Sequence, residues 1–362
     1  MSLIGLPRER LDTPALWVDL DRMERNIECL ADYFRQAGIA WRPHTKGIKV
    51  PAIVHKLLKA GAIGVTCAKL SEAEVMAASG VEDILVANQV VGDTKVARLI
   101  QLRRSADVMV AIDSLENATE IARAARDAGM RIRVLIELDS GMHRAGVPTG
   151  ETAISFTEKI AELPGLAFAG LMAWEGHAFR VLDRQEREAV IAKAVHQLVH
   201  TAELLRNAGI DFGIVSCGGS VSYQTASHIV GVTESQAGGA VFTDAAYLAR
   251  GVPLSPSLYV TATVTSRPTP TQVIVDAGRK SMDGSVAMPV PMGIDGATLS
   301  GLSAEHGTIQ LDRPSETPRV ADRIDFMVGY GDNTVYQHDL LYGVRGETIE
   351  AVWAILGRGK LT

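Results

Sequence analysis

The sequence predicts an α/β protein in which a (β/α)8 TIM barrel is followed by a C-terminal β-rich domain. Two observations support this fold class. From about residue 15 to residue 250, short apolar segments alternate with longer amphipathic segments, roughly eight times without a break. After the run at 250–256, which contains Pro and Gly, helical periodicity disappears and short β-rich segments follow. We therefore expect a barrel over residues 1–253 and a β domain over residues 254–362, with the first strand, near 13–19, as a candidate to join the β domain.

The predicted elements follow this alternation in order. Short apolar segments predict strands in the barrel region at 15–18, 39–42, 63–66, 83–86, 108–112, 132–137, 168–172, 213–216 and 231–234. Amphipathic segments predict helices between them, including those at 21–37, 50–60, 71–79, 115–128, 151–162 and 183–208. Ser71 and Glu74 have the spacing of a capping box. Further strands are predicted at 258–266, 272–276, 308–311, 323–328, 340–345 and 349–355.

Composition and charge exclude several classes of protein. The 362 residues are 47% hydrophobic and 22% charged, so the chain can bury a sizeable core. A net charge of -6 without a long basic run argues against a nucleic-acid partner. No apolar run approaches the ~18 residues of a membrane span, and the N-terminal apolar segment is too short for a signal peptide. The three cysteines are scattered without paired spacing, so we expect a cytoplasmic protein without a disulfide framework.

Lys46 is the most informative residue of the chain. It closely follows a predicted strand, in a run that also contains Arg42, His44 and Lys49. Lysine is usually a solvated surface group, but an amine at the end of a strand in an α/β protein suits Schiff-base chemistry with an aldehyde cofactor. From the spacing alone, a solvated loop lysine remains the alternative.

Other polar groups follow later strands, where a barrel gathers its catalytic residues. Arg144 follows one strand, and Trp174 and His177 follow the next. His177 is either a proton donor near the substrate or a capped loop histidine. Glycine pairs after two late strands predict backbone amide nests for a phosphate; these are Gly218-Gly219, followed by Ser220, and Gly238-Gly239.

Several runs, spread over nearly the whole chain, resemble one family. They are the segments at 13–21, 41–49, 69–73, 144–147, 218–220, 233–238, 276–280, 305–307 and 338–342. In these runs the chain is similar to the fold-type III pyridoxal-phosphate enzymes. Within these it resembles the D-threonine aldolase and D-serine dehydratase family, which shares the alanine racemase barrel. The run around Lys46 and the run Glu305-His306-Gly307 together make the resemblance specific.

The resemblance implies a pyridoxal 5'-phosphate cofactor that Lys46 holds as a Schiff base. It implies cofactor contacts from His44, Arg144, Trp174, Gly218, Gly219, Ser220, Gly238 and Gly239. Two of these positions differ from the family, which usually has tyrosine in place of Trp174 and Ser-Tyr in place of Gly239-Ala240. In the family the active site forms between the barrel of one subunit and the β domain of the other, which implies a homodimer. The role of Glu305-His306-Gly307 stays open.

A larger departure concerns a divalent metal. The family holds it beside the substrate's β-hydroxyl with a His-x-Cys or His-x-Asp pair, and the matching positions here are Tyr330 and Asp332. Neutral tyrosine is a poor ligand for Mg or Mn. Asp332 is then the only credible ligand left, and we expect no bound metal. The run at 329–332 also resembles the Gly-Tyr-Ala-Asp element of alanine racemases, whose tyrosine is an acid/base. Alternatively, Tyr330 is a packing aromatic and Asp332 a turn residue.

These features lead to a lyase as the first functional hypothesis. A small-molecule amino acid would be the substrate: a D-configured β-hydroxy amino acid that loses an aldehyde or water, as in most of the resembling family. The second hypothesis is an amino-acid racemase or epimerase with Lys46 and Tyr330 as opposed acid/bases. A third, a non-catalytic cofactor-binding protein like the single-domain barrel proteins, is disfavoured by the additional β domain.

Overall fold

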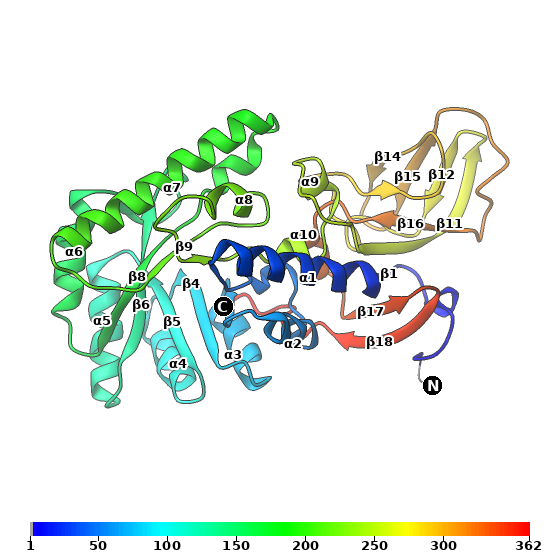
Figure 1. Ribbon diagram of the computed structural model, residues 1–362. Helices are drawn as coiled ribbons and strands as arrows, with labels where there is room; N and C mark the ends of the chain where they lie inside the picture. Colours follow the sequence, from blue (N-terminus) through cyan, green and yellow to red (C-terminus); the bar gives the residue numbers. More distant parts are fainter. Residues whose placement is uncertain (1–2) are drawn as a thin grey trace. The chain divides into compact units, whose positions relative to one another are not determined.

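The computed structural model describes residues 3–362, which form two compact units (Figure 1). The barrel unit comprises residues 30–46, 53–238 and 360–362. The β unit comprises the residues up to 29, residues 47–52 and residues 239–359. The N-terminal segment therefore belongs with the β-rich region, and the last three residues return to the barrel unit.

In the described part of the chain, the barrel unit contains a ring of eight parallel strands. In hydrogen-bonding order these are β2 (Ala40–Trp41), β10 (Glu234–Ser235), β9 (Ile214–Cys217), β8 (Leu166–Ala173), β6 (Ile132–Asp139), β5 (Asp107–Ile112), β4 (Asp83–Gln89) and β3 (Val65–Cys67). A parallel bridge between His44 and Thr66 closes the ring, and the Thr66 amide donates to the Pro43 carbonyl at 3.0 Å. Short β7 (Val147–Pro148) pairs with the end of β6. The predicted (β/α)8 barrel is confirmed.

Helices alternate with the strands, as the amphipathic pattern predicted. They are α1 (Leu20–Ala37), α2 (Pro51–Ala60), α3 (Leu70–Ala78), α4 (Asp93–Arg103), α5 (Leu115–Asp127), α6 (Glu151–Ala161), α7 (Arg184–Asn207) and the short α8 (Tyr223–Ala226) (Figure 1). Helix α1 follows β1 (Ala15–Asp19) of the β unit, and the others follow barrel strands. Strands of such a sheet are apolar on both faces because helices cover the outside and side chains fill the inside. One cluster of buried apolar side chains from neighbouring strands β4, β5, β6 and β8 consists of Leu85, Met109, Ala111, Leu135 and Met172.

Charged residues near the starts of the barrel strands form an ion-pair network around the buried Arg42. Arg42 donates from Nε to Glu234 and from Nη1 to Asp83, each at 2.9 Å. Arg133 pairs with the same Asp83 at 2.9 Å and with Asp107 at 2.6 Å. A buried cation needs such partners because its desolvation is otherwise uncompensated. Arg42, which the sequence groups with Lys46, is therefore a structural residue of the barrel.

The start of α3 differs from the predicted capping box. Lys69 is the N-cap, without a side-chain cap hydrogen bond. Ser71 instead pairs with the last residue: its amide donates to the Thr362 carbonyl at 2.8 Å and its Oγ accepts from the Thr362 amide at 3.2 Å. Glu74 pairs with Arg98 at 2.7 Å. The capping-box prediction is wrong because residues distant in sequence occupy both side chains.

The β unit is built on a mostly antiparallel sheet. Its strand order is β14 (Ala297–Leu302), β15 (Gly307–Leu311), β12 (Gln272–Val275), β11 (Leu258–Thr269), β1 (Ala15–Asp19), β17 (Leu340–Arg345) and β18 (Thr348–Ala354), with β16 (Arg323–Met327) on β11 and β13 (Val290–Pro291) on β16. Strand β1 lies antiparallel to β11 and parallel to β17. Trp17 on β1 stacks on Tyr259 of β11, with ring centroids 4.7 Å apart. The short helices α9 (Ala245–Leu248) and α10 (Gly331–Val335) complete this unit.

Among the described helices, none is both long and apolar enough to cross a membrane.

Candidate active site

The predicted residues of the barrel unit lie after the C-terminal ends of its strands. His44 and Lys46 follow β2, Arg144 follows β6, Trp174 follows β8, Gly218 to Ser220 follow β9, and Gly238 follows β10. Parallel strands of a barrel all end on the same rim. The topology therefore brings together groups that are far apart in the sequence.

Trp174 is the common neighbour of the two cations at this rim. The Lys46 Nζ lies 4.9 Å from the centroid of its ring and the Arg144 guanidinium carbon lies 5.0 Å from it. A cation over an indole face is attracted by the negative charge of the π system. Arg144 also donates to Glu137 at 3.2 Å, and Gln89 donates to the other oxygen of Glu137 at 2.6 Å. These contacts fix Arg144 over the indole.

The backbone around Lys46 is held from both sides. The Lys46 amide donates to His44 Nδ1 at 3.3 Å, and Thr45 Oγ1 donates to the buried Glu72 at 3.2 Å. The His44 amide donates to the Gln236 carbonyl at 3.1 Å. Gly238 packs so closely on the His44 backbone that a Cβ at position 238 would collide with it. Only glycine allows this approach, which joins the lysine turn to the second glycine pair.

The first glycine pair forms a turn supported from below by Glu175. Ser222 Oγ donates to Glu175 and accepts from the Gly219 amide at 2.8 Å, while the Gly218 amide lies 3.4 Å from Glu175 Oε2. The turn requires glycine at 218, where φ is +82°. The Gly218 and Gly219 amides thus have acceptors within the protein. Sequence reasoning missed Glu175 and Ser222 as the support of this turn.

Burial controls the ionisation of the groups beneath the turn. Glu175 is fully enclosed, and burial raises its pKa despite the hydrogen bond from Ser222. The pKa of the Cys217 thiol is raised well above its usual value by burial and by the nearby Glu175 and Glu234. A thiol of this kind stays neutral and packs.

His177 lies in a short 3-10 helix at residues Gly176–Arg180, after Trp174. Its buried Nδ1 has no hydrogen-bond partner among the described residues. Burial lowers the pKa of this imidazole, the neighbouring His143 lowers it further, and Asp139 opposes them. His177 is therefore a neutral imidazole with one free nitrogen, which is the state that can accept or relay a proton.

The β unit holds the other predicted residues. Tyr330 Oη donates to Asp332 Oδ2 at 3.0 Å, and Oδ1 of Asp332 fills the space beside Gly47. The Tyr330 ring lies edge-to-face on Tyr247, with centroids 6.0 Å apart. Burial and the adjacent Asp332 carboxylate raise the pKa of Tyr330 far above its usual value. The phenol is therefore protonated at any ordinary pH.

The Tyr330–Asp332 pair offers a divalent metal one carboxylate and one neutral phenol. Within residues 3–362, no three or more His, Cys, Asp or Glu side chains lie close enough together to hold an ion. One oxygen of Asp332 accepts a hydrogen bond from the Tyr330 phenol, which stays protonated. A neutral phenol is a poor ligand for a hard cation.

Pyridoxal phosphate does fit the barrel rim. Its aldehyde needs an amine and its phosphate needs a glycine turn, and the same indole borders both. Lys46 Nζ lies over the Trp174 ring, and a Cβ at Gly219 would lie 3.2 Å from Trp174 Nε1. Ser235 Oγ, next to Gly218, is buried without a hydrogen-bond partner among the described residues. The rim thus offers an amine and a glycine turn that both border the Trp174 indole.

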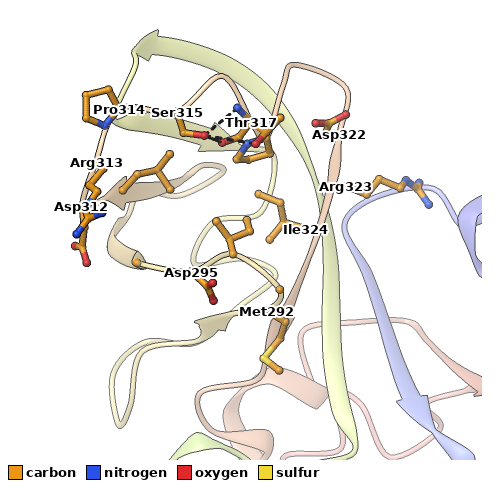
Figure 2. A pocket seen from close by; sticks show the side chains of 15 residues that line it. Met292, Asp295, Asp312, Arg313, Pro314, Ser315, Thr317, Asp322, Arg323 and Ile324 are labelled. Carbon is orange, nitrogen blue, oxygen red and sulfur yellow. Dashed lines mark hydrogen bonds between the residues drawn. The ribbon is translucent and has the colours of Figure 1, made fainter.

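A cavity of about 830 Å³ in the β unit is a separate feature (Figure 2). None of the predicted residues within the described chain lines it. Figure 2 shows Arg323 pointing away from the cavity, and its guanidinium donates to the Glu9 carbonyl at 2.8 Å. Ser315 and Thr317 are hydrogen-bonded to each other. The cavity presents no converging set of catalytic groups.

Comparison with known proteins covers both units. The family model described as "Alanine racemase, N-terminal domain" matches residues 18–246, and that described as "Putative serine dehydratase domain" matches residues 257–344. The chain is 36% identical to D-threonine aldolase from Arthrobacter sp, over 98% of this chain and 95% of that protein. It is 32% identical to 3-hydroxy-D-aspartate aldolase from Paracoccus denitrificans, over 99% and 95%.

A solved structure gives the same picture. The crystal structure of D-threonine aldolase from Filomicrobium marinum superposes with a TM-score of 0.96 at 36% identity, covering 100% of this chain and 99% of that chain. The similarity in sequence and fold thus extends from end to end, through the lysine turn and the C-terminal sheet. The chain belongs to the D-threonine aldolase and D-serine dehydratase family of pyridoxal-phosphate enzymes, which carries the alanine racemase N-terminal domain.

Proposed function

We propose that this protein is a pyridoxal-phosphate-dependent lyase acting on a D-configured β-hydroxy amino acid, by retro-aldol cleavage or by dehydration. The observation that carries this proposal is the arrangement around Trp174, where the Lys46 amine, the Arg144 guanidinium and the glycine turn meet one indole. Similarity to two aldolases over almost the whole chain supports the reaction class. The dehydratase-type C-terminal domain keeps dehydration as the second outcome.

In this proposal Lys46 holds the cofactor as a Schiff base, with His44, Arg144 and Trp174 around it. Ser220, Gly238 and Gly239 are the proposed donors to its phosphate. Gly218 and Gly219 shape the turn, because their amides already donate to Glu175 and Ser222. When bound, pyridoxal phosphate delocalises the electron pair that is left when a bond to the substrate Cα breaks.

The protein's own residues must then move protons at two atoms. At Cα, the Lys46 amine is positioned to remove or return a proton. At the β-hydroxyl, Tyr330 and Asp332 form the proposed relay: Tyr330 accepts the substrate proton as its own phenolic proton passes to Asp332. In dehydration the relay would start from an Asp332 protonated by solvent: Tyr330 protonates the departing hydroxyl as it takes the Asp332 proton, and the proton that Lys46 removes from Cα passes to solvent. His177, neutral and with one unpartnered nitrogen among the described residues, is a further candidate proton donor.

A racemase is the alternative function, and the sequence Gly-Tyr-Gly-Asp at 329–332 is the observation in its favour. A racemase would need Tyr330 to take a proton from, and give one to, the substrate Cα. The raised pKa of Tyr330 makes its anion costly to form. The lyase is therefore the better supported reaction.

We also propose a homodimer. Val286, Met288, Val290 and Met292 alternate along one segment of the β unit, and all are substantially exposed. A row of exposed apolar side chains is typical of a surface that another protein covers. Sedimentation equilibrium should give twice the chain mass of 38.7 kDa; a concentration-independent mass of one chain would exclude the dimer.

Product analysis tests the reaction. The cofactor-loaded protein is incubated with D-threonine, D-serine and D-alanine, with and without EDTA, and products are separated by chiral chromatography. We expect glycine and acetaldehyde from D-threonine if cleavage dominates, or the corresponding 2-oxo acid and ammonia from a dehydration. Conversion of D-alanine to L-alanine without cleavage of the hydroxy amino acids would establish the racemase instead.

A further inference from the structure

Asp244 is a buried carboxylate that the proposed reaction does not use. Asp244 is 1% exposed. It is the N-cap residue of α9 in the β unit. Oδ1 accepts from the Tyr247 amide at 2.9 Å, and Oδ2 accepts from the Gly331 amide at 2.7 Å. One carboxylate therefore binds two segments that are more than eighty residues apart in the sequence.

The Gly331 contact lies between the two residues of the proposed relay. Gly331 separates Tyr330 from Asp332, so its amide sets the direction in which both side chains leave the backbone. Two neighbouring hydrogen bonds strengthen this junction: the Ala245 amide donates to the Val328 carbonyl and the Ala246 amide to the Gly329 carbonyl, each at 3.0 Å. Backbone and cap groups at the start of α9 thus bind the segment from Val328 to Gly331, which carries Tyr330.

The Tyr247 contact acts on Tyr330 from the other side. Tyr247 lies in the first turn of α9, whose N-cap is Asp244. Its ring packs edge-to-face on the Tyr330 ring at an interplanar angle of 68°. An edge-to-face aromatic pair restricts the orientation of both rings. Asp244 therefore fixes the backbone that carries Tyr330 and also the backbone that carries the ring against it.

We propose that Asp244 is the positioning residue of the Tyr330–Asp332 pair, holding the phenol and the carboxylate in hydrogen-bonding register through Gly331 and Tyr247. This role rests on the proposed function, in which Tyr330 and Asp332 act on the substrate's β-hydroxyl. The competing role is that of a simple helix cap, because Asp244 also satisfies the first turn of α9.

The variant Asp244→Ser separates these two roles. Serine at an N-cap accepts from the amide of the third helical residue as aspartate does, but its shorter side chain cannot also reach the Gly331 amide. Asp183→Ser is the matched control, because Asp183 caps α7 of the barrel unit through the Glu186 amide at 2.8 Å.

We call the two hydrogen bonds from the Gly331 and Tyr247 amides to Asp244 the clamp. Amide hydrogen exchange at Gly331 tests this clamp without any substrate. We expect exchange at Gly331 to be at least about tenfold faster in Asp244→Ser than in wild type, and unchanged in Asp183→Ser. Equal protection of Gly331 in wild type and Asp244→Ser would overturn the proposal. If Asp244→Ser does not fold, Asp244→Asn, which keeps one acceptor oxygen, is measured in the same way.

A double-mutant cycle tests whether the clamp acts through Tyr330. In the wild-type background Asp244→Ser should lower kcat/KM by about 10- to 100-fold, as expected when a reacting group is displaced. In a Tyr330→Phe background the same change should cost less than about twofold, because the group that it positions is already gone. An equal loss in both backgrounds would mean that Asp244 acts on the fold alone. If wild type turns over no β-hydroxy amino acid, the proposed function fails, and the exchange measurement still decides the clamp.

Discussion

Tyr330 donates a hydrogen bond from its phenol to Oδ2 of Asp332 at 3.0 Å. The resemblance to the family matches these two positions to a pair of metal ligands, whereas the side chains present here form a donor and an acceptor. Burial and the carboxylate keep the phenol protonated by raising its pKa. The pair is thus suited to moving a proton, and its chemistry differs from that of two ligands that share a cation.

Replacement of Tyr330 by phenylalanine should lower kcat/KM by about 10²- to 10⁴-fold, the usual contribution of a positioned acid or base. Cofactor content and thermal stability should stay close to wild type, because only one hydroxyl is removed. Tyr336→Phe, at a tyrosine that is 44% exposed, is the control. If the enzyme is a lyase, Tyr330→Phe should still exchange the substrate's Cα proton with solvent. If it is a racemase, the variant should lose exchange of that proton from one face of the substrate. Full activity in Tyr330→Phe would remove Tyr330 from the reaction.

Chelation should leave most of the activity intact. Of the described residues, only Asp332 offers a credible oxygen ligand at the family's metal position, and that carboxylate accepts the Tyr330 hydroxyl. The measurement is turnover after dialysis against EDTA, with the metal content determined by elemental analysis. Loss of activity on chelation together with its recovery on adding Mn²⁺ would contradict the argument from the donors.

Borohydride reduction should attach the cofactor to Lys46. The candidate lysines are Lys46, Lys49 and Lys69. Lys46 Nζ lies over the Trp174 ring, whereas Lys49 belongs to the β unit and packs beside Gly357. Peptide mapping by mass spectrometry locates the reduced adduct, and Lys46→Ala should carry none. An adduct on Lys49 or Lys69 would overturn the assignment of the Schiff-base lysine.

Glu175→Gln should change how stability depends on pH. Burial raises the pKa of Glu175 above its ordinary value of 4.5, so the unfolded chain releases this proton at a lower pH than the folded chain does. Between the ordinary and the raised pKa, the carboxyl therefore lowers the free energy of unfolding as pH increases, and the loss persists above that window. Glutamine cannot ionise. Relative to wild type, the unfolding temperature of the variant should rise as pH increases from about 4.5.

The control for this measurement is Glu158→Gln, which removes a carboxylate from an exposed position of α6. If the difference in unfolding temperature between Glu175→Gln and wild type stays constant with pH, the prediction is wrong, because the buried carboxyl then does not titrate differently in the folded and unfolded chain. Thermal unfolding followed by circular dichroism at several pH values provides the comparison.

Sequence reasoning located much of the rim because of how barrels are built. Chemistry in a parallel barrel gathers after the strands, so a polar run after an apolar segment already marks its own position on the rim. Lys46, Arg144 and Trp174 could therefore be named from strand order alone, and the structure brings these three together. Glu175 lies between Trp174 and His177 in the sequence, but nothing in its spacing revealed that it supports the Gly218 turn.

By itself, the sequence determined the alternation of strands and helices, the change of texture near residue 250 and the substitution at Tyr330, because these depend on periodicity and residue identity along the chain. Only the tertiary structure decided which partner each polar group has. Arg42 pairs with Glu234 across 192 positions, Ser71 with Thr362 across 291, and Asp244 with Gly331 across 87. Hydrogen bonds and ion pairs act over a few ångströms in space, whatever the separation in sequence. Their partners are therefore fixed only when the strands have been ordered and the chain has closed on itself.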